Sequence, residues 1–355
     1  MTTTIPTQEA AAAEPQVRRQ LVGSVVQRQG AVVVLVLAVA AAWFTLPRFG
    51  SADNLRDIAL QSSFLAVIAL GMTFVIITGG IDLSVGSVYA LGGVLAAYGS
   101  QYGFVAALLL PLAVCGLIGL INGVLVARAG LAPFIVTLAT LLFARGLLLA
   151  LTSEGSTTYT ISDEAFLALG SGTFLGLGLP VWIAVVLFGI GGLVLRSTRF
   201  GQTVFAVGGA ESSATLMGLP VARTKLLVYT ASGLLAGFAG ALTAAYLQSG
   251  VTVIGVGTEL DAIAAVVIGG TLLTGGAGTV LGTAVGVVLR SVIGNVINQI
   301  GGLDSNIQSV ISGAFLLLVV VAQQLLSGRR PRRRRSAAQG STQAPAPTAG
   351  PAPDG

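Results

Sequence analysis

Long apolar runs separated by short polar segments dominate the pattern of this chain. Ten runs are long enough, or nearly so, to cross a bilayer as helices, since about 20 apolar residues span its hydrocarbon core. They are Ala31–Leu46, Leu55–Thr78, Ser87–Gly99, Gly103–Ala127, Leu131–Thr152, Leu179–Leu195, Thr224–Leu247, Leu260–Leu273, Val280–Ile297 and Ile307–Leu326. The third and eighth are short. The pattern predicts an all-α polytopic membrane protein with about ten transmembrane helices, within a range of about eight to eleven, including short or interrupted ones.

The composition agrees with a membrane protein. Of 355 residues, 54% are hydrophobic and 9% are charged, whereas soluble domains are about 25% charged. One cysteine, Cys115, excludes an internal disulfide, and the lack of histidine excludes histidine catalysis and histidine metal sites. Lys225, the only lysine, follows Thr224 and not glycine, so the phosphate-binding loop of an ATPase is absent. The chain therefore cannot hydrolyse ATP by that route, and we do not expect it to be an enzyme.

Polar segments and arginines predict the domain organisation. Residues 1–29 are expected to form a cytoplasmic tail, 30–327 a transmembrane domain, and 328–355 a disordered, basic, Pro/Ala-rich cytoplasmic tail. The first apolar run resembles a signal peptide only weakly, because a long leader precedes it and no polar mature domain follows. Most basic residues fall on one side of a ten-span chain, which places both termini in the cytoplasm.

Two hydrophilic segments interrupt the apolar pattern. Residues 153–178 carry acidic side chains and no basic one, so they are expected to form the main outer loop. Residues 198–222 are expected on the cytoplasmic side, with one short helix over Ala210–Leu216 between Gly208-Gly209 and Gly218-Leu219-Pro220. Such a helix would offer a docking surface, although a plain connecting loop is the alternative.

One carboxylate, Asp82, lies inside the apolar stretch Gly71–Ala97. A charged side chain at the bilayer centre costs about 2.5 to 3.5 kcal/mol on insertion scales, so it should face protein or a water-filled path. Gly79 and Gly80 precede it, which predicts an interruption between two membrane helices. The alternative is an ordinary loop in which Asp82 or Ser84 caps the next helix.

A weak internal repeat involves the same segment. Thr78-Gly79-Gly80 precedes Gly86-Ser87 at the offset at which Thr274-Gly275-Gly276 precedes Gly282-Thr283. Matching glycine breaks in two halves of a chain are typical of a central path, although small residues can also match by chance. Arg145 and Arg290 lie within apolar runs and should pair with carboxylates or extend to an interface. Glu259 and Asp261 are read as polar points on a path or as helix caps.

Five motifs carry a family resemblance. They are GGIDLSVGS (79–87), NGVLVARAGLAPFIVTLAT (122–140), AVGG (206–209), VYTASGLLAGFAG (228–240) and AAVVIGGTLLTGGAGTVLGT (264–283). With these motifs in order, the chain resembles the permease subunits of bacterial ATP-binding-cassette (ABC) importers for monosaccharides. These permeases form the ribose, xylose and inositol type of the branched-chain amino acid and sugar permease superfamily. The resemblance covers about residues 55–326.

The resemblance implies an importer in the bacterial cytoplasmic membrane. It would contain two permease copies (a homodimer or paralogues), cytoplasmic ABC ATPase subunits that bind ATP and Mg²⁺, and an extracytoplasmic sugar-binding protein. This chain would hold no cofactor, and its partners would include lipid but no nucleic acid. Ribose, xylose, galactose and inositol all remain open as substrates, as do a nucleoside and a furanose signal, which are less favoured. An ion-driven secondary sugar carrier and a purely structural membrane subunit are the competing interpretations.

Two sets of site residues follow. Because a sugar needs hydroxyl and amide partners more than charge, candidate residues for the substrate path are Thr78, Gly79, Gly80, Asp82, Ser84 and Asn122. By similarity, residues 198–222 would couple to the ATPase, with Phe205, Gly208, Gly209, Thr215, Leu216, Met217 and Gly218 as candidates. Where the family usually has basic or amide side chains, this loop has Gln202, Ala210 and Thr215. Docking is therefore expected to rest more on Phe205, Leu216 and Met217.

Overall fold

The predicted apolar runs form helices. The structure is a computed structural model that describes residues 31–300 and residues 310, 313, 314, 317 and 321. Its elements are a first helix (Ala31–Thr45), α2 (Ala52–Ile77), α3 (Val85–Gly99), η1 (Ser100–Tyr102), α4 (Phe104–Ala127), α5 (Pro133–Leu151), α6 (Glu164–Ser171), β1 (Thr173–Phe174), β2 (Leu177–Gly178), α7 (Leu179–Ser197), α8 (Arg199–Gly209), α9 (Glu211–Leu216), α10 (Val221–Leu247), α11 (Thr258–Ile268) and α12 (Val280–Ile300). The first nine predicted runs each correspond to a helix. The tenth run, like both predicted tails, lies almost wholly outside the described residues.

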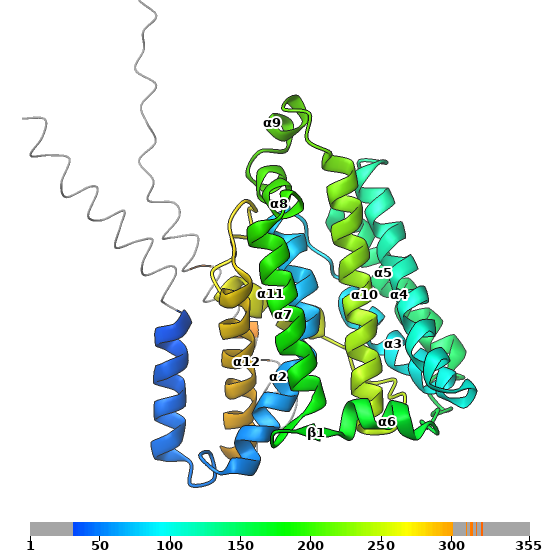
Figure 1. Ribbon diagram of the computed structural model, residues 1–355, viewed down its shortest axis with the longest axis vertical. Coiled ribbons are helices and arrows are strands. Elements are labelled where there is room, and N and C mark those ends of the chain that lie inside the picture. The colour runs from blue at the N-terminus through cyan, green and yellow to red at the C-terminus, as the bar shows by residue number, and fades with distance from the viewer. Residues whose placement is uncertain (1–30, 301–309, 311–312, 315–316, 318–320, 322–355) are drawn as a thin grey trace, which may run out of the picture.

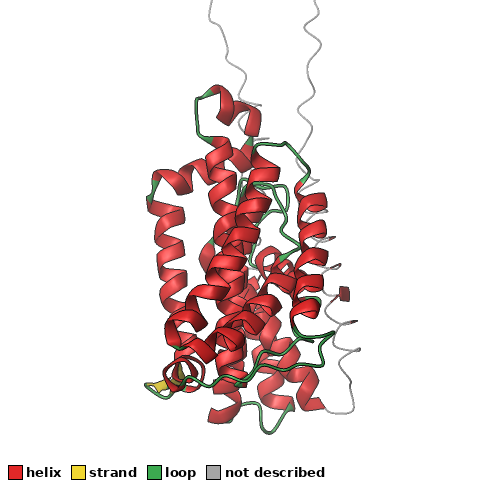
Figure 2. Ribbon diagram, turned by 90° about the vertical axis from the view of Figure 1, so that its right-hand side faces the viewer, coloured by secondary structure: helices red, strands yellow, loops and turns green. Residues whose placement is uncertain are grey.

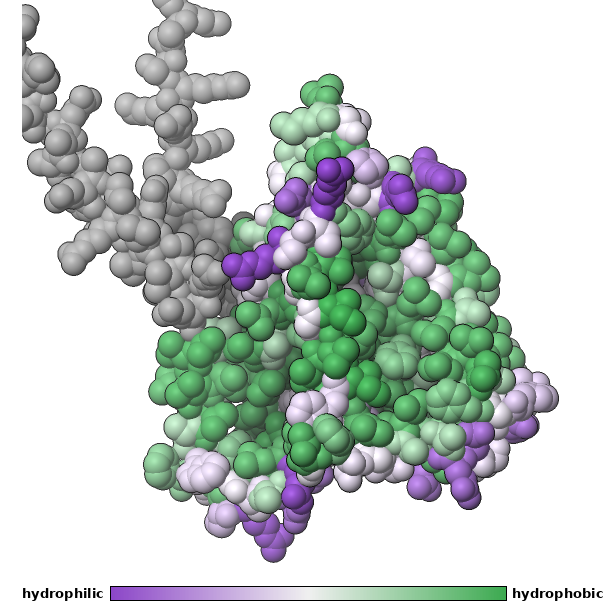
Figure 3. Space-filling view, in the orientation of Figure 1, coloured by the Kyte–Doolittle hydropathy of each residue, from purple (hydrophilic) through white to green (hydrophobic). Residues whose placement is uncertain are grey.

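Six of these helices are long and apolar enough to cross a membrane, namely α2, α4, α5, α7, α10 and α12. They run lengthwise through the molecule, with α8 and α9 at one end and α6 and the β1–β2 hairpin at the other (Figures 1 and 2). Hydrophobic side chains cover the band between these ends, and hydrophilic side chains gather at the ends themselves (Figure 3). This distribution fits a helical bundle with lipid around its middle.

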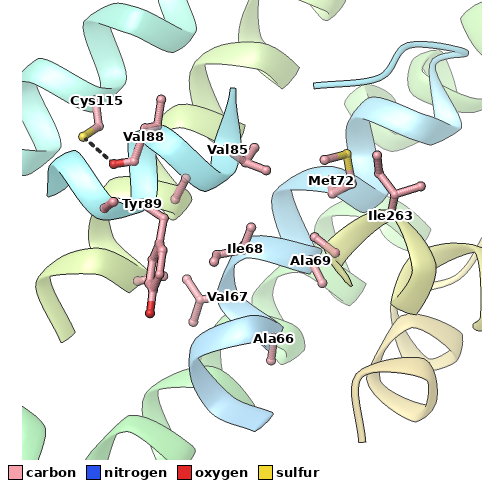
Figure 4. Close-up of a cluster of buried hydrophobic side chains, with 14 of the residues drawn as sticks. Ala66, Val67, Ile68, Ala69, Met72, Val85, Val88, Tyr89, Cys115 and Ile263 are labelled. Carbon is pink, nitrogen blue, oxygen red and sulfur yellow. Dashed lines mark hydrogen bonds between the residues drawn. The ribbon is translucent and has the colours of Figure 1, made fainter. Parts of the chain in front are cut away.

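Helices α2 and α10 form the centre of the bundle. The most apolar part of α2 is 83% buried and that of α10 is 61% buried, whereas the corresponding parts of α5 and α7 are only 22% buried. In the core, α2 side chains such as Val67 and Met72 pack against α3 and α11 (Figure 4). Cys115 of α4 lies in the same core and donates a hydrogen bond to the carbonyl of Val88. α5 and α7 are therefore outer helices of the bundle.

Glycines let α10 approach its neighbours closely. α10 packs most extensively against α4 and α3. A Cβ on Gly92 of α3 would lie 2.7 Å from the Cα of Gly237, and one on Gly119 of α4 would collide with the Tyr229 carbonyl of α10. Neither position leaves room for a side chain, so the helices meet backbone to backbone, as small residues allow in membranes.

The segment 198–222 differs from the prediction, because it contains two helices and not one. The expected helix is present as α9, but Arg199–Gly209 also form a helix, α8, capped by the Thr198 hydroxyl, which accepts a hydrogen bond from Gly201 N at 3.1 Å. Gly208 and Gly209 are the last residues of α8, and they stand just before α9, where the sequence predicts its boundary. Val204 and Val207 are buried against the bundle, which stabilises α8 despite its glycines.

Candidate functional site

The chain between α2 and α3 is broken as the glycines predict. α2 ends at Ile77, Gly79 has a φ of 80°, and α3 begins only at Val85. Because a positive φ is strained for other residues, Gly79 permits the turn that ends α2. Ser84 precedes α3 but makes no side-chain capping bond, so a simple serine cap does not describe this segment. The break brings polar backbone and Asp82 into the centre of the bundle.

Asp82 lies in a buried network of hydroxyl and amide groups. Its side chain is fully buried; Oδ1 accepts hydrogen bonds from Ser84 N at 3.0 Å and Ser84 Oγ at 2.5 Å. Oδ2 accepts one from the Ser232 hydroxyl of α10 at 2.8 Å, and Asn122 Nδ2 of α4 donates to Ser84 Oγ at 3.1 Å. No basic side chain forms an ion pair with Asp82 among the described residues. Hydrogen bonds from Ser84 and Ser232 thus stabilise this carboxylate in the interior, and Asn122 holds the Ser84 hydroxyl in place.

The other candidate path residues line a cavity beside this network. It has a volume of about 140 Å³, and its walls include Thr78, Gly79, Gly80, Glu211, Lys225 and Tyr229. Lys225 Nζ of α10 donates a hydrogen bond to Glu211 Oε1 of α9 at 2.6 Å. The structure therefore divides the predicted path residues into two groups. Asp82, Ser84 and Asn122 form the buried network, and Thr78, Gly79 and Gly80 border the cavity.

The two glycine breaks of the predicted repeat lie in contact. Gly276 N donates a hydrogen bond to the carbonyl of Ile77 at 2.9 Å, and a Cβ on Gly275 would lie 2.8 Å from Gly79 N. Gly208 of α8 packs onto the same junction, since a Cβ there would collide with the Ile77 carbonyl and lie 2.6 Å from Gly276 N. We call this contact of Ile77, Gly79, Gly208 and Gly275–Gly276 the glycine junction. It joins α8 directly to both breaks.

The end of α9 presents exposed apolar side chains. Leu216 is 89% exposed and Met217 is 77% exposed. They stand at the end of α9, which lies at one end of the molecule (Figure 1). Gly218 follows with a φ of 75°, which turns the chain toward α10. Phe205 differs from these two, because it is half-buried against the core beneath α8. Of the three expected apolar docking residues, Leu216 and Met217 are accessible.

Similarity to known proteins assigns the family. The family described as the permease component of the branched-chain amino acid transport system matches residues 54–320. The chain belongs to this permease family. The ribose import permease RbsC of Haemophilus influenzae is 40% identical over 263 residues, which cover 73% of this chain and 81% of that protein. The L-arabinose ABC transporter permease AraH of Azospirillum brasilense is 39% identical over 279 residues (78% and 81%), and RbsC of Escherichia coli K12 is 38% identical over 304 residues (84% and 94%). No solved structure matches the chain.

The predicted family resemblance is thus confirmed. The permease is a multi-pass membrane protein and a transport component, not an enzyme.

The two arginines inside apolar runs of the permease have different partners. Arg290 of α12 donates from Nε and Nη2 to both oxygens of Asp261 of α11, at 2.7 and 2.8 Å, as the sequence predicts for a membrane arginine. Arg145 of α5 does not hydrogen-bond to a carboxylate; it donates to the backbone carbonyls of Thr252 and Ile254 at 2.8 and 3.2 Å. The irregular chain before α11 supplies these carbonyls, because its backbone oxygens have no helical partner.

Sequence reasoning missed Tyr229 and Ser232 as site residues of the permease. Both lie on α10, three positions apart, so they share one face of that helix. Ser232 binds Asp82, and Tyr229 borders the cavity. Polar side chains at this spacing within an apolar span are the signal that would have found them, and both lie in the motif 228–240 that carries the family resemblance.

Proposed function

We propose that the permease forms the translocation path for a neutral monosaccharide of pentose size in an ABC importer of the bacterial cytoplasmic membrane. An extracytoplasmic binding protein delivers the sugar, a second permease copy completes the path, and cytoplasmic ATPase subunits bind ATP and Mg²⁺. The observation that carries the proposal is the similarity to proteins named as ribose and L-arabinose permeases, which extends over most of each chain. Ribose and L-arabinose are both uncharged five-carbon sugars.

The electrostatics of the site support a neutral substrate. Asp82 is fully buried and is not among the residues that line the cavity, and Lys225 and Glu211, which do line it, are paired with each other. The two opposite charges at the cavity therefore compensate each other. Sugar hydroxyls both donate and accept hydrogen bonds, so they match paired charges and hydroxyl groups better than an ion does.

The distribution of charge supports the orientation. The charged side chains at the α8–α9 end are mainly basic, whereas those at the α6–hairpin end are mainly acidic. The basic end carries Arg128, Arg196, Arg199, Arg223 and Lys225, and the acidic end carries Asp53, Asp57, Glu154, Asp163 and Glu164. Since positive residues are enriched on the cytoplasmic side, α8 and α9 face the cytoplasm in this proposal and can bind the ATPase.

The glycine junction suggests how ATP-driven motion reaches the path. Closure of the ATPase subunits displaces α9 through Leu216 and Met217, and α8 moves with it because the two helices are consecutive. Gly208 then transmits the displacement to Ile77 and Gly276, with no side chain between the three backbones. Both breaks change together, and access to the path switches from one side of the membrane to the other.

Purification of the permease from its native membrane, with identification of the co-purifying subunits, tests the proposal. We expect an ATPase and a sugar-binding protein, and ATP-dependent, vanadate-sensitive uptake of D-ribose or L-arabinose by the reconstituted complex. Sugar transport by the permease alone, without ATP, would instead identify an ion-driven carrier. An ATPase complex that transports no sugar would contradict the proposed substrate class.

Crosslinking tests the docking surface separately. Met217→Cys and Thr215→Cys introduce thiols on α9, and the native Cys115 is buried and does not compete. We expect Met217→Cys to crosslink to a cysteine-reactive site on the ATPase in the resting complex. Leu175→Cys, exposed at the opposite end, is the control that should not crosslink to it. Failure of both α9 variants to form a product in an intact complex would rule out α9 as the docking helix.

A further inference from the structure

An irregular segment, residues 250–257, runs beside α3 and joins the end of α10 to the start of α11. A Cβ on Gly250 would lie 2.9 Å from the Cα of Val94, in the second half of α3. One on Gly255 would collide with the carbonyl of Gly86, in the first turn of α3. The irregular segment therefore follows α3 back toward its start, where the α2–α3 break lies.

The irregular segment begins at the end of the molecule that carries α6 and the hairpin. Gly250 N donates a hydrogen bond to the Tyr159 carbonyl at 2.9 Å, and the Gln248 carbonyl accepts one from Ile161 N at 3.0 Å. Tyr159 and Ile161 belong to residues 153–178, which lie on the outer side in the proposed orientation. The irregular segment therefore connects the outer end of the permease with the centre of the bundle.

The backbone of the irregular segment has unused hydrogen-bond donors. Among the described residues, none of the N–H groups from Val251 to Val256 donates a hydrogen bond. An unpaired N–H group is costly in hydrocarbon, so irregular backbone at membrane depth occurs only where protein or water covers it. The side chains of Val253 and Val256 are nevertheless 78% exposed. The exposed face of the irregular segment is therefore unsuited to contact with lipid.

Two charged side chains beside the irregular segment favour water as its surroundings. Arg145 of α5 donates to the carbonyls of Thr252 and Ile254, at 2.8 and 3.2 Å. Glu259, in the first turn of α11, interacts electrostatically with Arg145 but forms no ion pair with it in the part of the chain that the structure describes. Both side chains are only partly buried. Charged groups within membrane segments typically face a water-filled path.

We propose that the exposed face of the irregular segment lines the outer half of the translocation path, and that Arg145 is the positioning residue that holds it there. Its guanidinium fork binds two carbonyls of the segment at once. The inference rests on the proposed function, because it assumes a path through the permease. It adds where the outer half of that path runs, whereas the cavity lies on the α9 side of the α2–α3 break.

Cysteine labelling tests the lining. Spheroplasts that carry Val253→Cys or Val256→Cys in the complete importer are treated with a charged, membrane-impermeant maleimide during sugar uptake, so that every state of the path is visited. Maleimide reacts with the thiolate, which forms in water and not in hydrocarbon. We expect both variants to be labelled and to lose uptake. Val186→Cys on α7 is the control that should stay unlabelled, although Val186 is 59% exposed.

The neighbouring Ile254 tests the role of Arg145. The Ile254 side chain packs against the core, so Ile254→Cys should be protected while Arg145 is present. Arg145→Met removes the donors, and we then expect Ile254→Cys to react. Uptake at matched membrane levels should fall about ten-fold in Arg145→Met, the effect of one hydrogen bond to a charged group. Arg145→Lys keeps a charged donor and should restore part of the uptake and of the protection.

The outcomes separate this inference from the proposed function. Labelling of both valine variants, with loss of uptake and an unlabelled Val186→Cys, supports the lining. Protection of both in an importer that transports sugar would overturn it, whether lipid, the second copy or another part of the chain covers the segment, and the proposed function would stand. Labelling that leaves uptake unchanged would also overturn it. Protection of Ile254→Cys in the Arg145→Met background would overturn the role of Arg145.

Discussion

The carboxylate of Asp82 is costly to bury, yet it helps to fix the packing around the α2–α3 break. The carboxylate is fully buried in an apolar bundle, yet both oxygens accept hydrogen bonds, from Ser84 and from Ser232. Burial of a charge without such partners would cost several kcal/mol. The bonds also join the α2–α3 break to α10, so the residue that is costly to bury helps to fix the packing around the break.

Loss of the Ser232 hydroxyl should destabilise the permease. Ser232→Ala leaves Oδ2 of Asp82 without a donor, and an unsatisfied buried acceptor costs about 1–3 kcal/mol. Thermal unfolding in detergent, followed by the loss of monodisperse protein, measures the effect. Ser62→Ala is the matched control: its hydroxyl is also buried but has no partner in the described residues, so we expect little change. Equal stability of the two variants would contradict the assigned role of Ser232.

The charge of Asp82 should matter for transport more than for assembly. In Asp82→Asn the amide oxygen can still accept from Ser84, and the Ser232 hydroxyl can turn to accept from the new NH₂ group. We therefore expect normal amounts of assembled complex but slower sugar uptake, measured at matched membrane levels. Unchanged uptake at normal expression would exclude a role for this charge in the path.

At the residue scale, the sequence identifies site residues of a conspicuous type, but it does not identify the residues that they contact. Asp82, Gly79 and Gly80 stand out because charge and glycine are conspicuous in an apolar run. Ser232 and Tyr229 do not, because a single hydroxyl in a membrane helix is common, and its importance depends on which helix faces it. Their partners, Asp82 and Gly80, lie about 150 positions away along the chain.

At the element scale, the membrane helices were predictable, and the structure within two connections was not. Residues 153–178 were expected as an outer loop but contain α6 and the β1–β2 hairpin, and residues 198–222 contain α8 in addition to the expected helix. Nine apolar runs became helices because length and hydropathy decide helix formation in lipid. α8 was missed because three of its eleven residues are glycine, which lowers helix propensity. The structure places Gly208 against the backbone of Ile77, so glycine is required there for close approach and not for a turn.

The two adjacent glycines of α8 allow a direct test of the glycine junction. A Cβ at Gly208 would collide with the Ile77 carbonyl, whereas a Cβ at Gly209 meets nothing within 4 Å. Gly208→Ala should therefore lower stability by about 1–3 kcal/mol, because the backbone must shift. It should also lower the amount of sugar transported per ATP hydrolysed. Gly209→Ala should change stability by less than about 1 kcal/mol. ATPase activity and sugar uptake, measured in the same proteoliposomes, give this ratio for both variants. An unchanged amount of sugar transported per ATP in Gly208→Ala would refute the role of the glycine junction.

At the scale of the whole molecule, the surface separates into an apolar band and two polar ends of different charge (Figure 3). The band is expected from composition, since a chain with 54% hydrophobic residues cannot bury them all. The location of the exposed apolar surface is not expected from composition. α5 and α7 expose most of their surface and α2 exposes little, although their hydropathies are nearly equal. Which helices are exposed depends on packing that hydropathy does not show, such as the close approach of the glycine-rich α10 to α3 and α4.

Cysteine labelling can test the orientation that the two ends imply. With α8 and α9 in the cytoplasm, a membrane-impermeant maleimide added to intact spheroplasts should label Leu175→Cys in the β1–β2 turn and leave Met217→Cys unlabelled. After permeabilisation both should react, because each side chain is 77% exposed. The wild-type chain is the background control, since its Cys115 is buried between α3, α4 and α10 and should stay unlabelled in the folded protein. Labelling of Met217→Cys before permeabilisation, with Leu175→Cys protected, would invert the topology. The α9 surface would then be out of reach of a cytoplasmic ATPase.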